Sequence, residues 1–164
     1  MNKNWRTEHN SAIDAFLKHL NANTQTFILK GGTALMKCYG LDRFSEDIDL
    51  DGDLKSKDIV SLVDSFCSAN GFSYRIAKNT DTVKRFFVNY GNSEKPLKVE
   101  VSYRQKELNM KQASIVNGIL VYNINALCML KTNAYAARDK IRDLYDISFI
   151  CDKYFDSLSE TVVD

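Results

Sequence analysis

Proline, net charge and long apolar runs are all scarce in this sequence. Pro96 is the only proline, and no proline-rich or other linker divides the chain. Lys and Arg number 22 against 21 Asp and Glu, so a net charge of +1 provides no global attraction to nucleic acid or membranes. No apolar run approaches the roughly 18 residues of a membrane span, and the segment MNKNWRTEHN is too polar for a signal peptide. These absences predict a cytoplasmic protein that does not contact a membrane.

Paired cysteines are also missing. The four cysteines are widely spaced without a CxxC pair, and they are Cys38, Cys67, Cys128 and Cys151. Three of them sit in apolar helical patterns, which favours buried free thiols over zinc ligands or a disulfide framework.

The length and hydrophobic periodicity predict one α+β domain over residues 1–164, with a core at about 26–122 and a C-terminal helical part at about 123–155. Helices are predicted at 7–22, 33–39, 57–71 and, in two segments, 124–154. Strands are predicted at 26–30, 45–54, 72–77, 83–90, 97–103 and 118–123. Together they indicate a small mixed sheet with helices packed against it. The three strands between 72 and 103 read as an antiparallel meander.

The segment SEDIDLDGDL places an aspartate at every second position. These aspartates are Asp47, Asp49, Asp51 and Asp53. In one interpretation, the stretch from Asp47 to Gly52 fits the first positions of an EF-hand calcium loop. Against it, the twelfth position is Asp58 rather than the usual Glu, and Gly40 interrupts the helix that should enter the loop.

In the alternative interpretation, DIDL is a strand that turns Ile48 and Leu50 into the core and both Asp47 and Asp49 onto the open face. The pattern LKVEVSY puts Glu100 on the polar face of a neighbouring strand, as a third carboxylate. Such a group suits Mg²⁺ and phosphoryl or nucleotidyl transfer, because magnesium prefers oxygen ligands and leaves positions open for phosphates. Crowding is expected to raise the pKa of all three acids.

The segment LKGGTAL predicts a phosphate-binding site. A strand ends, Gly31 and Gly32 allow close backbone approach, and the amides of Gly32, Thr33 and the opening helix point outward. The segment is neither a Walker loop nor a GxGxxG turn.

Four ordered motifs carry a resemblance to a known family. They are GGTAL with RFSEDIDL, LKVEV with Glu100, LKTNA with Lys131, and KIRD from Lys140 to Asp143 continuing to Asp146. Over about 28–150 they resemble the nucleotidyltransferase superfamily, and most closely the AbiEii-type toxins of type IV abortive-infection toxin–antitoxin systems.

The resemblance implies a nucleotidyltransferase-like fold and transfer of a nucleoside monophosphate from an NTP to RNA, a tRNA end in some members, or to a protein. It implies an antitoxin partner, a Mg²⁺ or Mn²⁺ ion held by Asp47, Asp49 and Glu100, and a catalytic role for these acids and Lys131. The implied nucleotide-binding residues are Gly31, Gly32, Thr33, Arg43, Ser45, Lys131, Arg142, Asp143 and Asp146. For Asp143 and Asp146 two roles stay open: orienting Lys131 or Arg142 by charge pairing, or accepting hydrogen bonds from the nucleotide.

Other residues and functions complete these expectations. On one continuous helix Lys131, Arg138 and Arg142 would fall within about 20° of each other, forming a cationic stripe for phosphates or RNA. His9 and His19 are expected on the surface. Tyr39, Phe44, Phe86 and Phe87 are aromatic candidates for base stacking or for the core. The alternative functions are a nucleotidyltransferase for a small molecule such as an aminoglycoside, and a catalytically silent nucleotide- or calcium-binding module.

Overall fold

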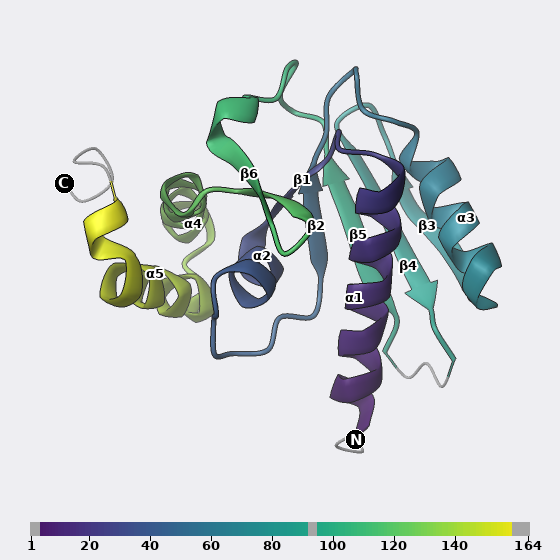
Figure 1. Cartoon of the computed structure of the whole chain (residues 1–164), viewed down its shortest axis with the longest axis horizontal. Helices are drawn as coiled ribbons and strands as arrows, with labels where there is room; N and C mark the ends of the chain where they lie inside the picture. Colours follow the sequence, from purple (N-terminus) through teal and green to yellow (C-terminus); the bar gives the residue numbers. More distant parts are fainter. Residues whose placement is uncertain (1–3, 92–94, 159–164) are drawn as a thin grey trace.

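The computed structural model describes residues 4–91 and 95–158. In it, helices are arranged around a seven-stranded mixed sheet (Figure 1). The helices are α1 (Asn4–Asn23), α2 (Gly31–Cys38), α3 (Ile59–Asn70), α4 (Ile124–Arg138), α5 (Ile141–Tyr154) and the short 3₁₀ turns Met110–Gln112 and Phe155–Ser157. The strands are β1 (Ile28–Lys30), β2 (Ile48–Asp51), β3 (Ser73–Asn79), β4 (Val83–Asn89), β5 (Leu97–Ser102), β6 (Ala113–Val116) and β7 (Ile119–Tyr122). The predicted α+β architecture is confirmed.

The strand order is β3-β4-β5-β2-β1-β7-β6. The predicted antiparallel meander is confirmed as β3, β4 and β5, and β5 then pairs in parallel with β2. In contrast, β6 was not predicted, because its residues are half-exposed and show no clear alternation. The Asn117-Gly118 pair between β6 and β7, with φ angles of 52° and 78°, is the signal that marks this hairpin.

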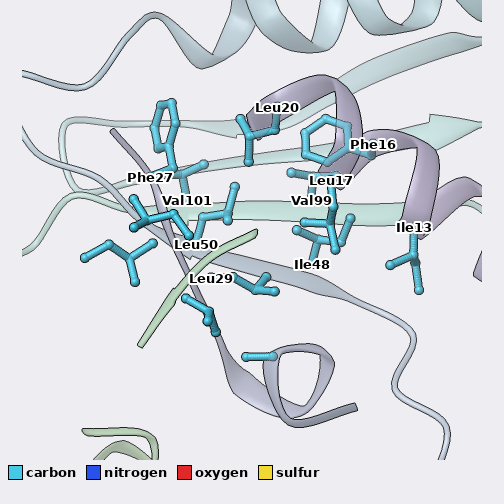
Figure 2. Close-up of a cluster of buried hydrophobic side chains, with 14 of the residues drawn as sticks. Ile13, Phe16, Leu17, Leu20, Phe27, Leu29, Ile48, Leu50, Val99 and Val101 are labelled. Atoms are coloured by element: carbon cyan, nitrogen blue, oxygen red, sulfur yellow. The ribbon is translucent and has the colours of Figure 1, made fainter. Parts of the chain in front are cut away.

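The main core lies where α1 covers the centre of the sheet. Figure 2 shows four apolar side chains of α1 facing the inner side of β1, β2 and β5. The labelled residues are Ile13, Phe16, Leu17, Leu20, Phe27, Leu29, Ile48, Leu50, Val99 and Val101. Each such side chain contributes about 1.5–3 kcal/mol when it is fully buried, so this contact fixes β2 and β5 firmly. Their opposite side carries the acids.

The helix ends mostly follow the predicted signals. Gly40, with φ of 77°, follows α2 and lets the Leu41 amide donate to the Leu35 carbonyl, while Gly71 ends α3 in the left-handed conformation. Asn123 caps α4 as predicted, by accepting from the Ala126 amide. The predicted glycine break before α2 is absent, because the helix begins at Gly31 itself.

The remaining helices divide into two groups. Figure 1 shows α2, α4 and α5 grouped together, apart from α1 and α3. Helix α1 contacts both β7 and β5, and α3 contacts β3. The chain between α4 and α5 turns at Asp139, which adopts a left-handed conformation with φ of 49°. Arg138 and Arg142 therefore lie on different helices, and the cationic stripe predicted for one continuous helix is wrong.

None of the helices in the described part of the chain combines the length and apolar character needed to cross a membrane. The four cysteines are free thiols; Cys67 and Cys128 are buried, Cys38 is half-buried and Cys151 is exposed.

Candidate active site

Two neighbouring strands place Asp49 and Glu100 on one side of the sheet, and Asp47 directly precedes the first of these strands. In the parallel pairing of β2 with β5, Asp49 lies opposite Glu100 and Ile48 lies opposite Val99. Ile48 and Val99 are buried in the core, so alternation turns Asp49 and Glu100 to the opposite side. The predicted strand interpretation of DIDL and the predicted orientation of Glu100 agree with this arrangement.

The glycine pair brings the first turn of α2 against these acids. Gly31 has a positive φ of 77°, and a Cβ atom there would come 3.2 Å from Asp49 Oδ2. A Cβ atom on Gly32 would come 2.5 Å from Arg43 Nη2 and 2.8 Å from Ser45 Oγ, closer than side chains tolerate. Thr33, the next residue, is buried. Its hydroxyl contacts Ser45 Oγ and donates to the Asp47 carbonyl. The Thr33 hydroxyl therefore orders the acidic segment.

A polar hollow of about 390 Å³ opens above the carboxylates. It is lined by Gly31, Gly32, Arg43, Phe44, Ser45, Glu46, Asp47, Asp49, Lys98, Glu100, Lys131, Arg138 and Arg142. An adjoining hollow of about 310 Å³ shares Asp49 and Glu100 and is walled by apolar residues of α4 such as Leu127. The residues predicted from sequence thus meet here, with the exceptions of Thr33, Asp143 and Asp146.

Asp143 and Asp146 form a buried charge network rather than part of the hollow. Both are 0% exposed. Asp146 accepts from Arg43 Nε at 2.7 Å and Nη2 at 2.6 Å, and Lys131 Nζ lies 2.8 Å from Asp146 Oδ2. Asp143 accepts from Lys131 Nζ at 3.2 Å and, twice, from Arg138. Of the two roles left open, the structure shows charge pairing, with Lys131, Arg43 and Arg138 rather than Arg142.

The same network is reflected in the Asp143 pKa. The hydrogen bond from Arg138 is the largest influence and lowers the Asp143 pKa, and the nearby Lys131 charge adds to it despite the opposing effect of burial. Asp143 is thus held as a carboxylate that fixes Lys131 at the wall of the hollow.

The pKa values of Asp49 and Glu100 are shifted in opposite directions. Burial is the main cause that raises the pKa of Asp49, and the negative charges of Asp47 and Glu100 add to it. Burial alone would also raise the pKa of Glu100, but the hydrogen bond from Arg85 and the Lys98 charge outweigh it, so this pKa is lowered. The expectation that crowding raises the pKa of every acid is therefore wrong for Glu100.

Two cations from the sheet stand among the acids. Arg85 Nε donates to Glu100 Oε2 at 2.6 Å, and Lys98 Nζ lies 3.8 Å from Asp47 Oδ2 and 3.7 Å from Glu100 Oε2. Among residues 4–91 and 95–158, no three acidic, histidine or cysteine side chains are gathered tightly enough for a ready-made metal site. The oxygen donors nevertheless fit a hard divalent ion, because the Lys98 ammonium already occupies a cationic position between Asp47 and Glu100.

The other aspartates of the segment SEDIDLDGDL, and Asp58 after it, have structural partners. Asp51 is buried and accepts from Lys30 and the Tyr122 hydroxyl. Asp53 accepts from the amides of Lys55 and Leu108. Asp58 caps α3 by accepting from the Val60 amide. The calcium-loop interpretation is therefore wrong, because a strand and separate partners replace a common coordination centre.

His9 is the residue that sequence reasoning placed wrongly. It is 1% exposed, with Nδ1 2.6 Å from the Tyr90 hydroxyl and Nε2 2.7 Å from the Glu46 carbonyl. A carbonyl only accepts, so Nε2 donates to Glu46 and steadies the backbone beside Asp47. The spacing of His9 with Ile13 and Phe16 on the apolar face of α1 was the available signal.

Comparisons with known proteins find a matching family model and similar folds. The family model "Nucleotidyl transferase AbiEii toxin, Type IV TA system" matches residues 15–163. The structure is similar to that of JHP933 from Helicobacter pylori, with a TM-score of 0.80 and 32% identity, covering 94% of this chain and 69% of that one. It is also similar to a putative nucleotidyltransferase from H. pylori, with a TM-score of 0.77 and 30% identity, covering 94% and 71%.

A more distant likeness concerns the fold alone. The antibiotic-resistance factor ANT(2'')-Ia superposes with a TM-score of 0.58 at 14% identity, covering 93% of this chain and 85% of that one. No curated protein matches the sequence.

Proposed function

Because the chain belongs to the AbiEii nucleotidyltransferase toxin family, we propose that it transfers a nucleoside monophosphate from an NTP to a macromolecular acceptor, RNA or protein. In this proposal it acts as the toxin of a type IV toxin–antitoxin or phage-defence system and has a cognate antitoxin.

One observation carries the proposal. Asp49 and Glu100 are paired in register on β2 and β5, directly beside the glycine turn of α2, in a hollow whose other wall is basic. Acids and phosphate-binding groups are separate requirements of nucleotidyl transfer, and this hollow combines both. A module that only bound nucleotide would have no need for the carboxylates of Asp49 and Glu100 this close to the phosphate-binding turn of α2.

Asp47, Asp49 and Glu100 would hold a divalent ion such as Mg²⁺ or Mn²⁺. Bound there, the ion would supply charge neutralisation for the NTP phosphates and the developing pyrophosphate. Lys98 and Arg85 would have to withdraw from the acids, and the phosphates offer both of them new anionic partners.

The triphosphate would lie against the first turn of α2. Gly31 and Gly32 let the backbone amides approach it, and the positive end of the helix favours the negative charge. Ser45 and Arg142 line the hollow, and Lys131 provides a positioned charge. Arg43 is already held by Asp146, so its contribution is to shape the wall beside Gly32.

The chemical step is a substitution at the α-phosphorus. An acceptor hydroxyl oxygen forms a bond to this phosphorus as the bond to the bridging oxygen of the β-phosphate breaks, and pyrophosphate leaves with that electron pair. The hydroxyl proton passes to one of the carboxylates and then to water. While Arg85 holds it, Glu100 is the weaker base, because its pKa is lowered.

The test is incubation with each of the four α-labelled NTPs, Mg²⁺ or Mn²⁺, total cellular RNA and cellular protein, followed by separation of the two fractions. We expect one fraction to carry label with the wild type and none with Asp49→Ala. Asp152→Ala removes an exposed acid from α5 and serves as the matched control. Absence of label with every NTP, or equal labelling by Asp49→Ala, would contradict the proposal.

A further inference from the structure

Two rows of side chains cross the sheet from its β3 edge to the candidate active site. The cross-strand pairs Lys78–Arg85, Arg85–Glu100 and Glu100–Asp49 form one row. Residues paired across strands share a face of the sheet, so this row lies on the side of the catalytic acids.

The second row runs beside the first. It is formed by the pairs Arg75–Phe87 and Phe87–Lys98, and Lys98 reaches Asp47 at 3.8 Å. Neighbouring strands are about 4.8 Å apart, so the first row spans three spacings, about 14 Å from β3 to β2. We call the five residues Arg75, Lys78, Arg85, Phe87 and Lys98 the basic sheet face.

Of the helices in the described part of the chain, α3 contacts β3 and α1 contacts β5, and both lie on the other side of the sheet. The Tyr74 hydroxyl donates to Asp64 of α3, and Tyr74 pairs with the buried Val88, opposite in direction to Arg75 and Phe87. Figure 2 shows α1 packed on the side of Val99. Arg75 and Lys78 are exposed, and the side chains of Arg85 and Lys98 are 34% and 30% exposed.

The charge of this face differs from that of the whole chain. The basic sheet face has four cations and an aromatic ring, and neither β3 nor β4 contains an acidic residue. The Arg75 guanidinium lies 4.4 Å from the centre of the Phe87 ring, a pair that can stack on a nucleobase. Cations in a line, interrupted by a stacking group, are typical of surfaces that follow a single-stranded nucleic-acid backbone.

We propose that the basic sheet face binds a single-stranded segment of RNA and delivers its hydroxyl to the acids at Asp49 and Glu100. This inference rests on the proposed nucleotidyl transfer and names its acceptor. The NTP would enter beside α2, whereas the RNA would approach from the β3 edge, so the two substrates meet over β2 and β5. A single strand suits the face better than a duplex, because stacking on Phe87 and Arg75 requires an unpaired base.

Binding is measured first, with a fluorescently labelled single-stranded RNA of mixed sequence and the corresponding RNA duplex, by anisotropy at several salt concentrations. We expect the single strand to bind more tightly than the duplex. The double variant Arg75→Ala/Lys78→Ala should weaken binding about tenfold and reduce the slope of log K against log salt by about 1.4, since each lost phosphate contact removes about 0.7. Phe87→Leu should weaken binding about tenfold with an unchanged salt slope.

A matched control removes the same charge elsewhere. Lys55→Ala/Lys57→Ala takes two exposed lysines from the segment between β2 and α3 and should leave RNA affinity unchanged. Thermal unfolding of every variant shows whether the fold is intact. Equal RNA affinity of Arg75→Ala/Lys78→Ala and the wild type, or equal losses in the control, would overturn the proposal.

Labelling then separates this inference from the proposed function. We expect label from the NTP on RNA, with KM for RNA raised in Arg75→Ala/Lys78→Ala. Label on protein while RNA stays unlabelled would overturn the RNA acceptor and leave nucleotidyl transfer standing. No label on either fraction would overturn both.

Discussion

Asp146 offers the sharpest test of how the site is built, because it is predicted to act through other residues rather than on the nucleotide. It is fully buried and receives Arg43 through two nitrogens and Lys131 through one. The variant Asp146→Ala removes the anion and leaves these two cations without it. The Lys131 side chain is only 8% exposed, so water cannot replace Asp146, and Lys131 keeps only the longer 3.2 Å contact with Asp143. The 23% exposed Arg43 regains some hydration.

The expected loss follows from this burial. Removing one partner of a buried ion pair costs about 3–5 kcal/mol, and each kcal/mol lowers the melting temperature of a chain this size by about 2–4 °C. We therefore expect Asp146→Ala to melt about 6–20 °C below the wild type. Asp146→Asn keeps the shape and one acceptor, so its loss should be smaller, near the roughly 1.5–3 kcal/mol of one charged hydrogen bond.

The assay is thermal unfolding followed by circular dichroism, with NTP binding measured by calorimetry on Asp146→Asn. Asp152→Ala, on the exposed side of the same helix, controls for loss of an acid and should change the melting temperature little. An unchanged melting temperature in Asp146→Ala, together with weakened NTP binding in Asp146→Asn, would refute the buried network and make Asp146 a nucleotide ligand.

Two further predictions concern the hollow. The pKa of Asp49 is raised, mainly by burial, so its ionisation opposes folding: the associated stability is present below the ordinary pKa of an aspartate and is lost as pH rises through the raised value. Asp49→Asn should therefore melt above the wild type at pH 7, with the gain disappearing near pH 4; a pH-independent difference would contradict this reasoning. In Gly32→Ala the new Cβ would lie 2.5 Å from Arg43 Nη2, so Arg43 must move away from Asp146. We expect loss of transfer and about 1–3 kcal/mol of stability, measured by urea unfolding, and full activity in this variant would show that the close packing is not needed.

Much of this arrangement was predictable because it depends on short-range periodicity. Alternation in DIDL and LKVEV assigned Asp49 and Glu100 to the open side of two strands, and the core residues Ile48 and Val99 to the other. Helix caps such as Asn123 and Gly71 are equally local, since a single residue satisfies or ends the backbone hydrogen bonding.

The contacts that connect distant segments could not be predicted in the same way. Arg43 and Asp146 are 103 residues apart, and nothing in the local pattern of either specifies the other. The pairing of Arg85 with Glu100 likewise depends on the register of β4 against β5, which the sequence left undefined. As a result, the direction of the Glu100 pKa was predicted wrongly although its position was predicted correctly.

The position of Lys98 has a consequence for the order in which substrates bind. Its ammonium group lies 3.8 Å from Asp47 and 3.7 Å from Glu100 and offsets part of their negative charge. Under the proposed function, a free ion would have to replace the Lys98 ammonium, which is covalently tethered to β5. An ion that arrives already bound to a triphosphate brings an anion that can receive Lys98 as it leaves. We therefore expect the metal and the nucleotide to enter as one complex.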